Sequence, residues 1–187
     1  MSRIVEGAIM DILAYYKISL ADENFKDTPY RTAKVYDEFL KGYSEEDIEK
    51  IMSKSFPSEL REMTVVKNIP ATTLCPHHLL PVLLRVTIGY IPNGRVLGLS
   101  KFNRLVKLIA KAPLLQEDLT KILADTINDY LKPFGVIVVV SGKHTCMIIR
   151  GIEQPDAEVT TSSVRGVFDD NHNIKMEFFK VWKNGNV

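Results

Sequence analysis

A change of pattern near Pro57 most constrains the fold of this chain. Beyond it, four segments rich in β-branched residues are bounded by Pro, Gly or Asn, which is typical of strands. These segments are MTVVKNI (63–69), LLPVLLRVTIGYI (79–91), VIVVVSG (136–142) and TCMIIRGI (145–152). Before Pro57, apolar residues recur at the helical period instead. The sequence therefore predicts helices first and a sheet afterwards.

Three helices are expected ahead of the strands, over residues 4–16, 29–41 and 45–52. For the second, Thr28 is a plausible N-cap and Pro29 suits the first helical position. For the third, Ser44 and Asp47 form a weak capping box.

A further helical region is expected between the second and third strand segments. Residues 100–135 repeat apolar side chains at helical spacing, with an interruption at Pro113. Two consecutive helices, or one kinked helix, fit this pattern. The predicted fold class is α+β, with N-terminal helices followed by a mostly antiparallel sheet packed against a helical pair. A single domain over 1–187 is expected, with a helical part at 1–56 and a sheet-containing core at 57–187.

Composition excludes several classes of protein. The 24 Lys and Arg balance 23 Asp and Glu, so we expect no general attraction to nucleic acid or to an anionic membrane. The N-terminal segment carries acidic residues and indicates an amphipathic helix rather than a secretion signal. No run approaches the ~18 apolar residues of a membrane span. With only two cysteines, a disulfide-rich secreted protein is disfavoured and a cytoplasmic location is expected.

Cysteine and histidine are concentrated in two short segments. Both cysteines and three of the four histidines lie in CPHH at 75–78 and HTC at 144–146. Thiolate and imidazole are preferred zinc ligands, and three protein ligands leave a fourth position open, as in catalytic sites. Two cysteines and one histidine would satisfy this pattern.

Spacing alone leaves other readings of this cluster open. Cys75, His77 or His78, His144 and Cys146 could close a structural zinc site, or the cysteines could be merely buried thiols. In a strand, His77 and His78 would point to opposite faces, whereas His144 and Cys146 would share one. One histidine of the pair is then free for another role. His172 stands apart and is expected to be a solvated loop residue.

The order of several motifs resembles that of the GTP cyclohydrolase I family. The match covers about residues 60 to 180 densely through CPHH, IGYIPNGRVLGLSKFNRLV, LLQEDLT, GVIVVVSGKHTCMIIRG and TTSSVRGVF. DTPYRTAK at 27–34 extends it towards the N-terminus. The resemblance implies a T-fold (tunnelling-fold) core assembled into a toroidal homo-oligomer, by resemblance a decamer. It also implies active sites at subunit boundaries, so that a lone chain would lack complete sites.

The resemblance implies roles for the cysteine and histidine cluster. Cys75, His78 and Cys146 match the zinc ligands, and His77 and His144 match the proton-transfer histidines. The phosphate-binding positions of the family correspond to Ser100, Lys101, Arg104 and Arg150, with Arg31 as a further candidate. Guanidinium groups suit phosphate geometry. The guanine-reading pair corresponds to Gln116 and Glu117, and a carboxylate can accept from the N1–H and the exocyclic amine of guanine.

The implied reaction is hydrolytic opening of the imidazole ring of GTP. Zinc would activate water for attack on C8, while His77 and His144 protonate ring nitrogens. Formate would leave, and the product would reclose to 7,8-dihydroneopterin triphosphate, a pterin precursor of folate-type cofactors.

Two departures from the family pattern affect this expectation. Pro76 stands where an acidic residue is usual, and Ala112 replaces an arginine. Two alternatives therefore remain. One is a divergent T-fold enzyme that takes a related purine nucleotide or stops at ring opening, and the other is a non-catalytic zinc- or nucleotide-binding ring subunit. Retention of both His77 and His144 favours an enzyme.

Overall fold

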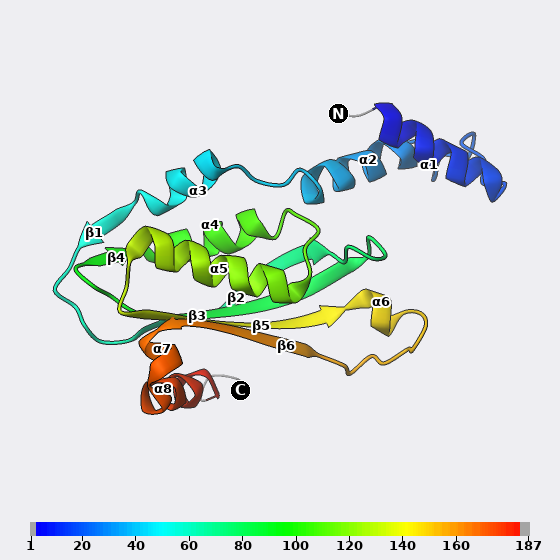
Figure 1. Ribbon diagram of the computed structural model, residues 1–187. Coiled ribbons are helices and arrows are strands. Elements are labelled where there is room, and N and C mark those ends of the chain that lie inside the picture. Colours follow the sequence, from blue (N-terminus) through cyan, green and yellow to red (C-terminus); the bar gives the residue numbers. More distant parts are fainter. Residues whose placement is uncertain (1–2, 184–187) are drawn as a thin grey trace. The chain divides into compact units, whose positions relative to one another are not determined.

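The computed structural model describes residues 3–183, which divide at Lys41 and Gly42 into two compact units (Figure 1). In the first unit, α1 (Arg3–Tyr15) and α2 (Thr28–Phe39) contact each other. The predicted cap of α2 is wrong by one residue. Asp27 occupies the N-cap without a side-chain cap bond, and Thr28 is already helical. Pro29, whose fixed φ suits a first helical turn, follows it.

The second unit contains a four-stranded antiparallel sheet in the order β2-β3-β5-β6 and a small β1-β4 pair. Its elements are α3 (Glu45–Met52), β1 (Ser55–Pro57), β2 (Thr64–Leu74), β3 (Pro81–Ile91), β4 (Arg95–Leu97), α4 (Leu99–Ile109), α5 (Gln116–Leu131), β5 (Gly135–His144), α6 (Thr145–Ile148), β6 (Val159–Gly166), α7 (Val167–Asp170) and α8 (His172–Lys183). The expected α+β class is confirmed.

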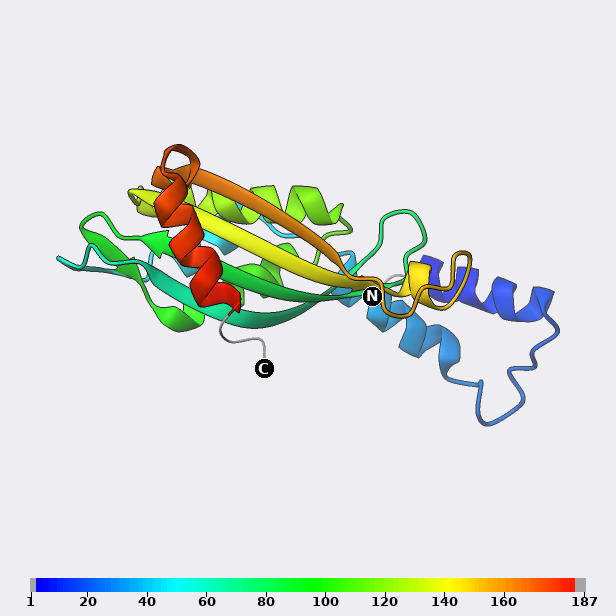
Figure 2. The ribbon, with the colours of Figure 1, turned by 90° about the horizontal axis from the view of Figure 1, so that it is seen from below.

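The central strand β5 explains why helices cover both faces of this sheet. Val136, Val138 and Val140 contribute to a core shared with α4 and α5. Ile137 and Val139, which point the other way, pack in a second core with Phe168 and Phe178 of α7 and α8. Figures 1 and 2 show α4 and α5 on one face and α8 crossing the strands on the other. A run of apolar residues without alternation is the signature of a strand buried on both faces.

Local signals placed several elements correctly. At the start of α3, Ser44 Oγ accepts a hydrogen bond from the Asp47 amide at 3.2 Å, and Asp47 Oδ2 accepts from the Ser44 amide at 3.1 Å. The predicted capping box is therefore confirmed. The helical region between β3 and β5 is broken around Pro113 into α4 and α5, as two consecutive helices.

The expected strand over 145–152 is wrong. β5 ends at His144, and the next residues form the short helix α6 followed by a turn. The fourth strand of the sheet is β6, whose Thr- and Ser-rich sequence VTTSSVRG carries little hydrophobic signal. Short apolar runs do not distinguish strands from helical turns by composition alone.

The C-terminal helix α8 is an element that the pattern did not predict. Its Phe178 is fully buried and lies against Gly89 of β3, where an added Cβ would come within 2.6 Å of the ring. His172, expected in a solvated loop, is exposed but begins this helix. Gly89 thus allows α8 to approach the sheet closely.

Candidate active site and metal centre

The segment CPHH lies in the turn between β2 and β3 and not in a strand. The Cys75 amide donates to the Leu80 carbonyl at 2.9 Å, and the Leu79 amide donates to the Cys75 carbonyl at 2.8 Å. Leu79 adopts a positive φ of 52° to close this turn. Cys75 is buried at the end of β2, whereas His77 and His78 are exposed. A turn, unlike a strand, allows neighbouring histidines to face the same thiol.

The pairing of β3 with β5 brings the second segment to this turn. Val82 lies opposite His144 in the register. The Thr145 hydroxyl donates to the Pro81 carbonyl at 2.6 Å and fixes the start of α6. His144 is therefore the last residue of β5, whereas Cys146 is the second residue of α6. The expectation that these two side chains share a strand face does not apply.

Cys75, His78 and Cys146 form a group that could hold a metal ion, with ligand atoms all within 4.8 Å of one another. The two Sγ atoms are 3.8 Å apart, and Cys75 Sγ lies 3.7 Å from His78 Nδ1. A tetrahedral zinc ion with Zn–S near 2.3 Å and Zn–N near 2.0 Å requires separations of roughly 3.8 Å and 3.5 Å. The donor set and its spacing therefore fit zinc, with three protein ligands.

His77 lies beside this group without belonging to it. Its Nδ1 is 3.8 Å from Cys75 Sγ, and its ring centroid is 6.2 Å from that of His78. The three-residue group includes His78 and not His77. This arrangement leaves His77 exposed at the edge of the site.

Burial and nearby charges tune two groups in the site. Burial raises the pKa of the Cys146 thiol, the adjacent Cys75 thiol raises it further, and Arg150 opposes this. Burial also lowers the pKa of His144, and the Glu117 carboxylate acts in the opposite direction. The charges of Arg150 and Glu117 therefore act on the pKa values of Cys146 and His144, respectively. A lowered pKa favours neutral imidazole at neutral pH.

Gln116 is the first residue of α5 and is almost fully buried. Its Oε1 lies 2.9 Å from His144 Nε2. Its Nε2 faces the Val140 carbonyl at 3.0 Å, the Val159 carbonyl at 2.9 Å and Thr161 Oγ1 at 3.2 Å. The side chain thus joins the start of α5 to β5, β6 and His144.

The three candidate phosphate ligands on α4 lie away from the metal group. Thr73, just before Cys75, donates from its hydroxyl to the Ala112 carbonyl at 3.0 Å, which places the C-terminal end of α4 near the site. Ser100 and Lys101 lie in the first turn of α4, at the opposite end of this eleven-residue helix, which is about 16 Å long. Arg104 is exposed on the same helix.

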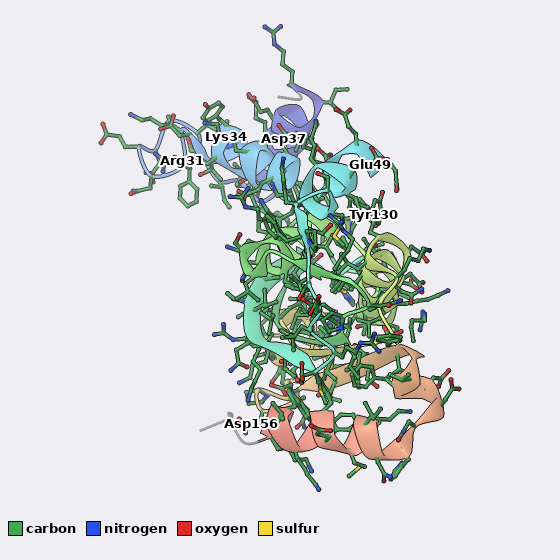
Figure 3. The ribbon with its side chains drawn as sticks, turned by 90° about the vertical axis from the view of Figure 1, so that its left-hand side faces the viewer. Arg31, Lys34, Asp37, Glu49, Tyr130 and Asp156 are labelled. Atoms are coloured by element: carbon green, nitrogen blue, oxygen red, sulfur yellow. The ribbon has the colours of Figure 1, made fainter. Side chains whose placement is uncertain are left out.

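Arg31 belongs to α2 in the first unit, where it is exposed and pairs with Asp27 at 3.3 Å (Figure 3). Arg150 follows α6 in the second unit, and its charge lowers the pKa of the Cys146 thiol. The candidate anion ligands are therefore scattered over three parts of the chain.

The two departures from the family pattern do not disrupt the metal group. Pro76 is exposed in the turn, and the donor atoms of Cys75, His78 and Cys146 still converge. At Ala112 the backbone carbonyl binds Thr73, a contact that does not depend on the side chain.

Thr120 and Thr161 support the site but were not singled out from sequence. Thr120 Oγ1 donates to the Gln116 carbonyl at 2.6 Å and lies 2.6 Å from Thr161 Oγ1. Thr161 reaches Thr120 and Gln116 because β6 pairs with β5, and no local sequence motif predicts this contact.

Comparison with known proteins finds similarity to GTP cyclohydrolase I over almost the full length of this chain. The family model for GTP cyclohydrolase I matches residues 5–183. GTP cyclohydrolase 1 of Pelotomaculum thermopropionicum is 42% identical over 180 residues, which cover 96% of this chain and 95% of that protein. GTP cyclohydrolase 1 of Desulforamulus reducens is 42% identical over 174 residues and 92% of each chain. Among solved structures, an archaeosine synthase QueF-like protein is 23% identical and covers 56% of this chain and 93% of its own, with a TM-score of 0.47. With the match running through both cysteine-containing segments, the chain belongs to the GTP cyclohydrolase I family.

Proposed function

We propose that this member of the family is a zinc-dependent enzyme that hydrolyses GTP to 7,8-dihydroneopterin triphosphate and formate. The convergence of Cys75, His78 and Cys146 beside His144 carries this proposal, because it combines a three-ligand metal site with an imidazole that can transfer protons. When bound, zinc supplies Lewis acidity and lowers the pKa of coordinated water towards neutrality. Two free thiols as ligands suit a reducing compartment, such as the cytoplasm. Within residues 3–183, no helix is long and apolar enough to cross a membrane.

The protein's own side chains supply proton transfer and recognition. His144 and His77 exchange protons with the imidazole nitrogens of the bound guanine. Glu117, whose charge acts on the pKa of His144, accepts hydrogen bonds from guanine N1–H and its amine. Arg150, whose charge lowers the pKa of the Cys146 thiol, binds the triphosphate through its guanidinium group.

A complete site requires more than one copy of the chain. Ser100 and Lys101 lie in the first turn of α4, at the opposite end from the contact with Thr73, and Arg104 lies in the middle of this helix. The N-terminal turn of a helix favours anions, which suits this set to the triphosphate. We propose that a neighbouring copy in a toroidal homo-oligomer, by resemblance a decamer, supplies these cations, with Arg31 as an additional contact.

Metal removal tests the proposal. Zinc-loaded protein is incubated with GTP, and formate and oxidised pterin fluorescence are followed before chelation, after chelation and after zinc is restored. We expect both products to disappear on chelation and to return with zinc. His144→Ala should lose turnover while retaining zinc. Absence of both products from intact, zinc-loaded protein would exclude GTP hydrolysis, and formate without pterin would indicate an enzyme that stops at ring opening.

A further inference from the structure

The side-chain amide of Gln116 is held in one orientation. Three groups face its Nε2: the carbonyls of Val140 and Val159 and the hydroxyl of Thr161. Carbonyl oxygens only accept, so the atom facing them must be the NH₂ group. The opposite orientation would place Oε1 against two carbonyl oxygens.

The hydroxyl of Thr161 enforces the same orientation. Thr120 has a single hydroxyl hydrogen, and this is donated to the Gln116 carbonyl at 2.6 Å. In the 2.6 Å contact between the two threonines, Thr161 must then be the donor. Thr161 has no hydrogen left for Gln116 and can only accept from it. All three partners therefore require a donor at this end of the amide.

The amide oxygen consequently faces His144. Gln116 Oε1 can only accept, so His144 Nε2, at 2.9 Å, must carry a hydrogen. Among the residues that the structure describes, 3–183, no hydrogen bond to His144 Nδ1 is observed. A neutral imidazole carries one ring hydrogen, so with that hydrogen on Nε2 the lone pair lies on Nδ1.

We infer that Gln116 is a positioning residue, which fixes His144 as the Nε2–H tautomer and directs proton exchange with the substrate through Nδ1. This inference rests on the proposed role of His144. Nδ1 first takes a proton from water, leaving hydroxide; the Nδ1–H bond then breaks as this proton passes to an imidazole nitrogen of guanine, and the Nε2–H bond persists throughout. Both ends of the Gln116 side-chain amide hydrogen-bond to groups of the protein, so Gln116 does not bind guanine. Glu117 alone of this pair then binds guanine.

A methionine substitution distinguishes a role of Gln116 in positioning His144 from a role in binding guanine. Gln116→Met keeps the length of the side chain but removes the acceptor for His144. Misorientation of a proton-transfer group predicts a fall in kcat of about 100-fold, with KM and the Kd for GTP changed by less than about twofold. Gln154→Met is the matched control at an exposed glutamine and should behave as the wild type. An intact kcat with a weakened Kd for GTP would overturn the inference in favour of guanine reading.

A double-mutant cycle tests whether Gln116 acts through His144. If it does, Gln116→Met should add almost nothing to the loss already caused by His144→Ala. Bound zinc and the denaturation midpoint are measured for each variant. Equal losses in the two backgrounds would show that Gln116 acts independently of His144 and would overturn the inference.

The tautomer is also measurable without substituting Gln116. Zinc-loaded protein carrying ¹⁵N-histidine is examined at neutral pH, with His144→Ala to assign the signal of His144. We expect hydrogen on Nε2 and a bare Nδ1, and the reverse would overturn the inference. If the wild type produced neither formate nor pterin, the proposed function would fail, whereas this spectrum would still decide the tautomer.

Discussion

At the residue scale, the adjacent histidines of the CPHH turn have different surroundings. His78 completes a group whose ligand atoms lie within 4.8 Å of one another, whereas His77 contacts Cys75 from outside that group. Both side chains are exposed. Their different positions, and not their burial, are the reason that we propose a ligand role for His78 and a proton-transfer role for His77.

Substitution of each histidine in turn tests this division. We expect His78→Ala to weaken zinc binding by at least about tenfold, since even supporting partners of metal ligands contribute this much. His77→Ala, the matched control one residue away, should retain one zinc per chain while losing turnover. Zinc is measured by elemental analysis after gel filtration. Loss of zinc from His77→Ala with retention in His78→Ala would reverse the assignment.

Much of this site could be inferred from residue types. The clustering of Cys75, Cys146 and three histidines pointed to a metal, and the structure brings both thiols and His78 together. The choice between His77 and His78 could not follow from strand alternation, because the pair lies in a turn. The contact of Gln116 with His144 joins residues 28 positions apart and depends on how α5 lies against β5.

At the element scale, the start of α3 depends on its capping box. Ser44→Ala removes the side chain that accepts from the Asp47 amide. We expect the free energy of unfolding to fall by about 1 kcal/mol, measured by urea denaturation. Ser44→Asn, which keeps a capping oxygen, is the control and should retain most of the stability. Equal stability of wild type and Ser44→Ala would show that the box contributes nothing.

The contact between α3 and α5 involves a half-buried tyrosine. Tyr130 of α5 donates a hydrogen bond to the Glu45 carboxylate of α3, and Glu49 lies nearby (Figure 3). The hydrogen bond, with smaller contributions from burial and both carboxylates, raises the pKa of Tyr130 to about 12. Because a raised pKa favours the protonated folded state, this contribution is complete below the ordinary value and is lost as pH rises from about 10 to about 12.

Replacement of Tyr130 by Phe should remove the high-pH tyrosine ionisation. The difference between absorbance titrations of wild type and Tyr130→Phe should show a group that ionises above the ordinary tyrosine range. A difference spectrum with its midpoint at the ordinary tyrosine value would show that Glu45 does not hold the phenol.

The close approach of α8 to the sheet depends on Gly89. A Cβ at this position would lie 2.6 Å from the Phe178 ring, so Gly89→Ala must displace the ring or the helix. We expect a loss of about 1–3 kcal/mol in the free energy of unfolding. Gly7→Ala, where no atom lies within 4 Å of the added Cβ, is the control. Restoration of stability by the pair Gly89→Ala and Phe178→Leu would locate the effect in this contact.

Sequence patterns predicted elements best where local chemistry decides them. The capping box of α3 and the break near Pro113 are local, and both expectations hold. The boundary between β5 and α6, in contrast, is followed by the apolar run CMII (146–149), whose composition also suits a strand. The weakly apolar β6 is a strand because its backbone pairs with β5 from Gly135 to Gly142. Amino-acid composition does not predict such long-range pairing.

At the scale of the whole molecule, the two halves of the proposed site lie at opposite ends of α4. Thiols and His144 gather near its C-terminal end, whereas Ser100 and Lys101 begin it. This separation is the structural reason to expect active sites shared between copies of the chain.

Complementation between inactive chains tests the shared site. His144→Ala disables the metal half and Arg104→Ala weakens the phosphate half. If each site combines halves from two chains, co-assembly of equal amounts should restore roughly a quarter of the wild-type sites by random association. Activity of co-expressed chains is compared with that of each variant alone. Mixed oligomers no more active than the two parents would show that both halves come from one chain.

The stoichiometry of products from GTP tests the central claim most directly. In a single reaction of the zinc-loaded protein, GTP consumed, formate released and 7,8-dihydroneopterin triphosphate formed are measured together. Our account predicts equal amounts of all three, with neither product formed by His144→Ala that retains its zinc. Consumption of GTP without formate, or no consumption by intact zinc-loaded oligomer, would contradict it.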